Sequence, residues 1–152
     1  MIRTIACEPS AREMTLEVGV ADGDWRNSLS FLRHENQSHY ESSRSDGHSN
    51  GTWSGSVRTI RAATDIVPLA FSYTERDDYE TRLTYERDDG SIEVLKGEGT
   101  DSNNGLRHSL TTLPTAEFQR IKQFHVQSRR YQWIEFRNIS LQLGHRTKVE
   151  VR

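Results

Sequence analysis

The chain has a single cysteine, Cys7, among its 152 residues. An internal disulfide therefore cannot form, which fits a reducing compartment without requiring one. Long apolar runs are also missing, because none approaches the ~18 residues that a membrane-spanning helix needs. The first residues lack the apolar segment of a signal peptide. We therefore expect a soluble protein without direct membrane insertion, with the cytoplasm as the default location.

An excess of charge of one sign is missing too. Lysine and arginine number 20 against 22 aspartate and glutamate residues, which leaves a net charge of −2. Nucleic-acid binding needs a clustered basic surface, so we expect no nucleic-acid partner. The hydrophobic fraction of 33% is low, but near-neutral charge disfavours outright disorder. The length fits a single domain over residues 13–152, after a tail or edge segment of residues 1–12.

Catalytic and cofactor-binding motifs are equally missing. The sequence contains no Gly-x-Ser-x-Gly elbow, no Gly-x-Gly-x-x-Gly loop and no Walker-type loop. The lone cysteine has only arginines as basic neighbours, which does not favour an activated thiolate. The acidic pairs Asp77-Asp78 and Asp88-Asp89 fall in expected turns, where aspartate is favoured for backbone reasons. We therefore assign no catalytic residue and no cofactor, and we expect that the protein is not an enzyme.

The chain does contain a pervasive alternation of apolar and polar residues. A strand with one buried and one exposed face produces this pattern. The pattern predicts strands over residues 14–20, 29–32, 57–62, 69–73, 79–86, 92–94, 106–110, 123–144 and 147–151. Asp88-Asp89-Gly90 predicts a hairpin turn. The polar stretch 33–56 is either one long loop or, through Asn50-Gly51, a hairpin of two short strands.

Only one segment, near residues 115–122, has a helix signal. Thr115 is a candidate cap, and Phe118 and Ile121 are spaced to form one buried stripe. About eight to ten short strands with one short helix predict a mainly β fold. The architecture we expect is an antiparallel β-sandwich or a jelly-roll-like barrel.

The densest run of aromatic and β-branched residues lies between residues 123 and 144. We interpret it as the central strand, with Trp133 or Phe136 as the key residue of the core. A buried tryptophan is usual in a small β domain, so Trp25 is also expected in the core. Trp53 lies within the long polar stretch and is the tryptophan that we expect to be exposed.

Two groups of residues are candidates for binding. His34, His39 and His48 offer zinc-type ligands, but their spacing matches no established zinc pattern, so they are weak candidates and no metal is expected. Trp53, Arg129 and Glu135 could form a ligand surface. An aromatic ring would stack on a sugar or peptide there, while the charged side chains bind its polar edges.

Two segments carry a family resemblance. The first is residues 16–25, and the second runs through residues 80–83 and Gly90 to residues 121–144, which include Gln-Ser-Arg-Arg-Tyr-Gln-Trp-Ile-Glu-Phe-Arg-Asn. The chain resembles a non-catalytic domain near the C-terminus of many planctomycete proteins. That domain often follows a membrane-bound M56 (BlaR1/MecR1-like) peptidase region or a sigma-factor-like region. The family usually has proline at the positions of Arg130 and Leu143. The resemblance implies a regulatory accessory domain and carries over no catalytic or ligand-binding residue.

Three functions therefore stay open. The first is a non-catalytic binding or sensory module that recognises a peptide, a glycan or a partner domain, with a homo-oligomer among the options. The second is a structural module that packs between domains. The third is a carbohydrate-active or metal-dependent enzyme.

Overall fold

The computed structural model describes residues 2–4, 12–33, 39–45, 52–60, 65–97 and 99–152. The chain divides into two compact units. Unit 1 comprises residues 1–23 and 130–152, and unit 2 comprises residues 24–129. The single domain expected over residues 13–152 stays a prediction, and each unit is described separately.

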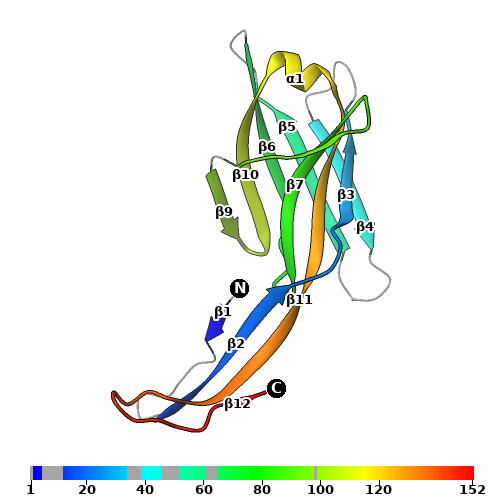
Figure 1. Ribbon diagram of the computed structural model, residues 1–152. Helices are drawn as coiled ribbons and strands as arrows, with labels where there is room; N and C mark the ends of the chain where they lie inside the picture. The colour runs from blue at the N-terminus through cyan, green and yellow to red at the C-terminus, as the bar shows by residue number, and fades with distance from the viewer. Residues whose placement is uncertain (1, 5–11, 34–38, 46–51, 61–64, 98) are drawn as a thin grey trace. The chain divides into compact units, whose positions relative to one another are not determined.

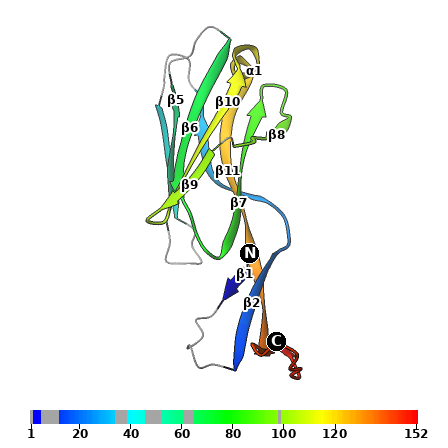
Figure 2. The ribbon, with the colours of Figure 1, turned by 90° about the vertical axis from the view of Figure 1, so that its left-hand side faces the viewer.

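Unit 2 is built from two antiparallel β-sheets. One sheet has the order β3-β11-β7-β8, from β3 (Arg26–Leu32), the first half of β11 (Ile121–Ser140), β7 (Tyr79–Arg87) and β8 (Ile92–Val94). The other has the order β4-β5-β6-β10-β9, from β4 (His39–Ser45), β5 (Thr52–Thr59), β6 (Ile66–Thr74), β10 (Leu106–Pro114) and β9 (Gly99–Asn103). Figures 1 and 2 show these sheets as two facing layers. The mainly β, sandwich-like fold is thus confirmed.

Two strand pairs lie where the sequence predicts hairpins. Gly90 adopts a φ of +83°, which glycine takes without steric cost, and β7 pairs with β8 on either side of the predicted turn. In the polar stretch 33–56, β4 pairs with β5 in an antiparallel ladder from Ser45↔Thr52 to His39↔Arg58. The hairpin interpretation of this stretch is therefore confirmed. Asn50-Gly51, its predicted turn, lies outside the described residues.

The core of unit 2 lies between the two sheets. The Phe71 and Phe124 rings meet there edge to face, with their centroids 5.6 Å apart. The remaining buried apolar side chains of this core are Leu29, Phe31, Trp53, Val57, Val67, Leu69, Tyr73, Leu83, Tyr85, Leu95, Leu113, Ile121 and Val126. The alternation of each strand supplies these residues to the inner face, as the sequence pattern predicts.

Trp53 belongs to this core, so the expectation that it is exposed was wrong. Only 2% of Trp53 is exposed, and its ring meets that of Tyr79 edge to face at 5.6 Å. The physical reason is that Trp53 is the second residue of β5 rather than part of a loop, and it points inward.

The helix α1 (Thr115–Gln119) is shorter than the sequence predicted. Pro114 occupies the N-cap position, and no side chain caps the helix. Thr115 instead donates its backbone N–H to the Asp65 carbonyl at 2.9 Å. Ile121 falls in β11, and Phe118 stacks on Phe124 with centroids 6.3 Å apart. Among the described residues, no helix has the length and apolar character needed to cross a membrane.

Unit 1 contains β1 (Ile2–Thr4), β2 (Glu13–Ala21), the second half of β11 and β12 (Glu150–Val151). The order is β1-β2-β11, with β12 also pairing with β11. Residues 2–4 pair with β2, so part of the expected tail is an edge strand. The strand expected over residues 147–151 is limited to β12.

Trp133 and Phe136 lie in unit 1 and are only half-buried, so neither is the key core residue that the sequence suggested. The fully buried apolar residues of β11 lie in its first half and include Phe124 and Val126. Trp25 is half-buried as well, and the expectation that it is a core residue was also wrong.

Candidate functional site

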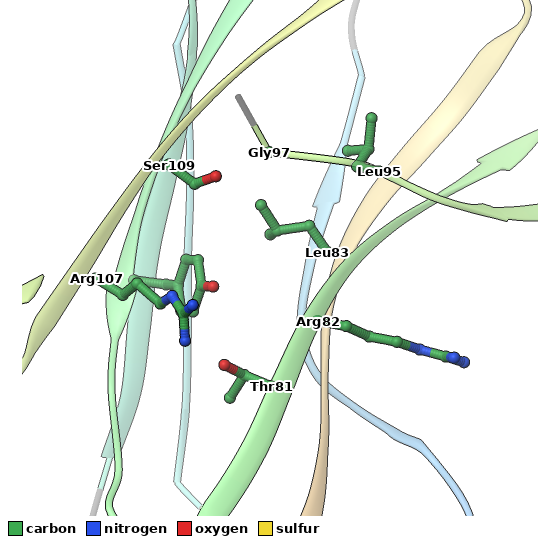
Figure 3. Close-up of a pocket in the computed structure, with 8 residues that line it drawn as sticks. Thr81, Arg82, Leu83, Leu95, Gly97, Arg107 and Ser109 are labelled. Carbon is green, nitrogen blue, oxygen red and sulfur yellow. The ribbon is translucent and has the colours of Figure 1, made fainter. Parts of the chain in front are cut away.

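A polar pocket of about 210 Å³ lies between the two sheets of unit 2. Figure 3 shows it between β7 and the strands of the opposite sheet, with residues 95–97 along its upper edge. Its lining residues are Tyr73, Thr81, Arg82, Leu83, Leu95, Gly97, Arg107 and Ser109.

The alternation of β7 decides which of its side chains enter the pocket. Thr81 and Leu83 point toward the opposite sheet, whereas the Arg82 side chain points away from it (Figure 3).

Gly97 allows the segment after β8 to pass close to β10. A Cβ atom at this position would lie 2.7 Å from the Ser109 Oγ atom. The glycine therefore keeps the Ser109 hydroxyl at the pocket wall.

Three hydroxyl groups converge on the pocket, from Tyr73, Thr81 and Ser109. Hydrogen bonding from the Thr81 hydroxyl acts to lower the pKa of the Tyr73 phenol. Burial raises the pKa of the Tyr73 phenol above its ordinary value of 10.0, so this group keeps its proton at neutral pH. Each hydroxyl can both donate and accept a hydrogen bond.

Arg107 lines the pocket and forms an ion pair with Glu75, which is not one of the lining residues. Arg107 Nη1 lies 3.2 Å from Glu75 Oε1, and the Ser102 hydroxyl donates to the other oxygen of Glu75. The Arg107 side chain is 35% exposed, so its remaining N–H groups are accessible. Leu83 and Leu95 supply an apolar wall. The pocket can therefore bind a small neutral group that has several hydrogen-bonding atoms.

The residues expected to form a ligand surface have separate partners. Trp53 is in the core, and Arg129 donates from Nε to Glu80 Oε2 at 2.5 Å. Glu135 lies in unit 1, where Arg137 Nε donates to it at 2.8 Å. That hydrogen bond lowers the pKa of the Glu135 carboxyl. Trp53 cannot act as an exposed stacking ring in this arrangement.

The histidine candidates for a metal site remain a prediction. His34 and His48 lie outside the described residues, and His39 is the first residue of β4. Within the part of the chain that the structure describes, no three histidine, cysteine or acidic side chains gather as metal ligands do.

Sequence analysis missed two serine–histidine pairs, each formed across neighbouring strands. Ser72 Oγ lies 2.8 Å from His108 Nδ1, and Ser30 Oγ lies 2.9 Å from His125 Nδ1. Glu86 Oε2 lies 3.6 Å from His125 Nε2, beyond hydrogen-bonding distance. His125 itself is 1% exposed. Neither pair has the base–orienter geometry of a nucleophilic triad, so we build no catalytic site on them.

The pocket residues were also missed, although the sequence carries a signal for them. In β10 the buried positions include Ser109 and Thr111, where the alternation calls for apolar residues. Polar side chains at inward positions are costly unless they bond within the protein or to a ligand. No family model, no curated protein and no solved structure matches this chain.

Proposed function

We propose that this protein is a non-catalytic binding module whose pocket between the sheets of unit 2 takes one sugar residue of a glycan. The observation that carries the proposal is that three residues with hydroxyl groups, together with Arg107, line one pocket. The proposal assigns no catalytic residue and needs no cofactor.

The chemistry of the pocket matches the chemistry of a sugar. Neighbouring sugar hydroxyls need donors and acceptors side by side, which the Arg107 guanidinium and the lining hydroxyl groups provide. The Leu83 and Leu95 side chains suit the apolar C–H face of a sugar ring. The volume of about 210 Å³ is below the roughly 300 Å³ at which pockets for drug-sized ligands begin. A single sugar residue therefore fits better than a larger ligand.

A structural packing module is the alternative that the same observations favour least. Such a module has no need for hydroxyl groups at inward-facing strand positions, where apolar residues would give a more stable core. A peptide ligand is the other alternative, because an amide side chain would use the same donors and acceptors.

The test is a titration followed by two-dimensional amide NMR, with a panel of neutral monosaccharides, short oligosaccharides and amide-rich peptides. We expect a saturable shift of signals from residues 73, 81 and 107–109 with at least one sugar. Thr81→Val, which removes only a hydroxyl, should weaken binding about tenfold, since an unpaired buried partner costs ~1–3 kcal/mol.

Arg58→Gln is the matched control for Arg107→Gln, because Arg58 is an exposed arginine on β5. We expect Arg107→Gln to abolish binding and Arg58→Gln to leave it unchanged. Saturable binding of peptides alone, or sugar binding that survives both Thr81→Val and Arg107→Gln, would overturn the proposal.

A further inference from the structure

A second cluster lies on the side of β7 that faces away from the pocket. It consists of Trp25, Arg82 and Arg129, all in unit 2. The Arg82 guanidinium carbon lies 4.2 Å from the centroid of the Trp25 ring, and that of Arg129 lies 4.5 Å from it. Figure 3 shows the Arg82 side chain extending away from the pocket. The cluster therefore lies on the opposite side of β7, although Arg82 also borders the pocket.

Among the described residues, each arginine donates a hydrogen bond through its Nε atom. Arg82 Nε donates to Gln127 Oε1 at 2.9 Å, and Gln127 Nε2 donates to Asn27 Oδ1 at 2.9 Å. Arg129 Nε donates to Glu80 Oε2 at 2.5 Å. Within the described residues, these bonds involve the Nε atoms and not the terminal nitrogens of the two guanidinium groups. The groups are therefore held in a fixed orientation, and their terminal nitrogens can still donate hydrogen bonds.

The charges of the cluster do not balance. Two guanidinium groups share one indole ring, and among the described residues the Glu80 carboxylate forms an ion pair with Arg129. Stacking on an aromatic face attracts each cation but does not neutralise it. The pKa of Arg82 is lowered, first by burial and then by the nearby charge of Arg129. An arginine remains charged at neutral pH even so, and the excess positive charge persists.

We propose that this cluster is an oxyanion site, in which a sulfate, phosphate or carboxylate group accepts hydrogen bonds from the terminal nitrogens of Arg82 and Arg129. Planar guanidinium forks match the geometry of such oxyanions, and they lose less hydration on binding than an ammonium does. Trp25 and Gln127 hold Arg82 in place before the ligand arrives, which reduces the entropy lost on binding.

The first experiment titrates the intact protein with sodium sulfate, sodium phosphate and sodium acetate, each at a constant ionic strength kept with sodium chloride. The arginine Nε–H signals of Arg82 and Arg129 and the indole signal of Trp25 are followed by NMR. We expect saturable shifts of these three signals. Linear shifts that sodium chloride alone reproduces would overturn the proposal, because they indicate only screening of exposed charge.

Substitutions separate a binding site from a structural cluster. Arg82→Gln should weaken sulfate binding at least tenfold, and Arg82→Lys should weaken it nearly as much because a lysine lacks the fork. Arg58→Gln removes the same charge from an exposed position on β5 and should leave binding unchanged. If Arg82→Gln disturbs the fold, Arg129→Lys tests the same point. Equal affinity in the wild type and both Arg82 variants would overturn the proposal.

Glu80→Gln gives the sharpest outcome. Glu80 offsets the positive charge of Arg129 through its bond to Nε, so its neutralisation should tighten sulfate binding several-fold. A purely structural ion pair would show no gain in anion affinity.

A sulfated disaccharide, compared with its unsulfated form and with free sulfate, identifies the source of the anion. Tighter binding of the sulfated sugar assigns the oxyanion to a glycan, and equal binding assigns it to a free anion.

Discussion

The two halves of β11 have the same sequence pattern but different environments. In the first half, Phe124 and Val126 are completely buried against the second sheet of unit 2. In the second half, Trp133, Ile134 and Phe136 are only half-buried within unit 1. Strict alternation predicts a strand in both halves. It does not say whether another layer covers the apolar face, and that layer decides how much each residue stabilises the fold.

The largest expected effect tests this difference directly, by comparing Phe124→Ala with Phe136→Ala. Phe124 contacts the rings of Phe71 and Phe118, so its removal leaves a cavity that the surrounding core cannot fill. We expect Phe124→Ala to lower the free energy of unfolding by about 3–5 kcal/mol. Phe136→Ala should cost less than about 2 kcal/mol, since the half-exposed ring buries less apolar area.

Denaturation in urea, monitored by circular dichroism, measures both free energies. Native-state hydrogen exchange then shows which unit opens in each variant. Equal losses in the two variants would contradict the comparison, because they would mean that Phe136 is packed as tightly as Phe124.

A second pair of substitutions adds a methyl group to one glycine in each unit. A Cβ atom at Gly55 would lie 2.8 Å from the Ser72 carbonyl oxygen, which is backbone and cannot move aside. At Gly19 it would lie 2.9 Å from the Trp133 ring, a side chain that can tilt. We therefore expect Gly55→Ala to cost about 1–3 kcal/mol and Gly19→Ala less than about 1 kcal/mol.

Thermal unfolding measures the two losses, and the indole signal of Trp133 supplies an internal check. The ring should move in Gly19→Ala and stay in place in Gly55→Ala. A larger loss of stability in Gly19→Ala than in Gly55→Ala would contradict the prediction.

The same contrast explains how much of the fold could be predicted from the sequence. Strands, the Gly90 hairpin and the sandwich-like class follow from alternation and turn chemistry, which act over a few residues. The burial of each tryptophan does not follow from these local patterns. Trp53 looked like a loop residue because polar residues surround it, yet its strand position points it into the core. Trp133 looked like a core residue because apolar neighbours surround it.

The candidate sites depend on contacts between distant segments, so the sequence alone could not place them. Tyr73, Thr81 and Ser109 come together only because β6, β7 and β10 lie in facing sheets. Arg82 of β7 and Arg129 of β11 both lie over the ring of Trp25, which precedes β3. The sequence signal for such a site is a polar residue at an inward-facing strand position, such as Ser109. This signal does not show which other residues contact it.

Protonation gives a third way to compare the two halves of β11. Burial lowers the pKa of the His125 imidazole below its ordinary value of 6.5, although the nearby Glu86 carboxylate acts in the opposite direction. When the pH falls through about 6.5, the unfolded chain binds a proton that the folded protein does not. The free energy of unfolding must therefore fall, with a slope of at most about 1.4 kcal/mol per pH unit.

His125→Gln should flatten this slope between pH 6.5 and 5, because glutamine does not titrate there. Glu135→Gln, in the second half of β11, should leave the slope in this range unchanged. The pKa of Glu135 is lowered by its hydrogen bond with Arg137, and its effect on stability is confined to more acidic pH. Urea denaturation at a series of pH values measures the slopes. An unchanged slope in His125→Gln would show that His125 is not the group responsible.

The smallest expected effect concerns the backbone. In unit 1, β11 advances from Phe136 to Ile139 while β2 advances only from Leu16 to Met14, so β11 contains a bulge. Asn138 lies in this bulge with a φ of +59°, a conformation that asparagine tolerates better than other residues with a Cβ atom. Asn104 has a φ of +52° in the β9–β10 turn of unit 2 and provides a matched comparison.

Asn138→Ala and Asn104→Ala should each cost about 1 kcal/mol, because alanine lacks the local hydrogen bonds that offset the strain. The glycine variants at both positions should be nearly neutral, since glycine adopts positive φ freely. Thermal unfolding of the four variants measures the effect. If alanine is tolerated at residue 138 but not at residue 104, the bulge relaxes more easily than the turn, and the second half of β11 is held less firmly than the hairpins of unit 2. Equal costs would mean that unit 1 fixes its backbone as tightly as unit 2 does, even though its side chains are less buried.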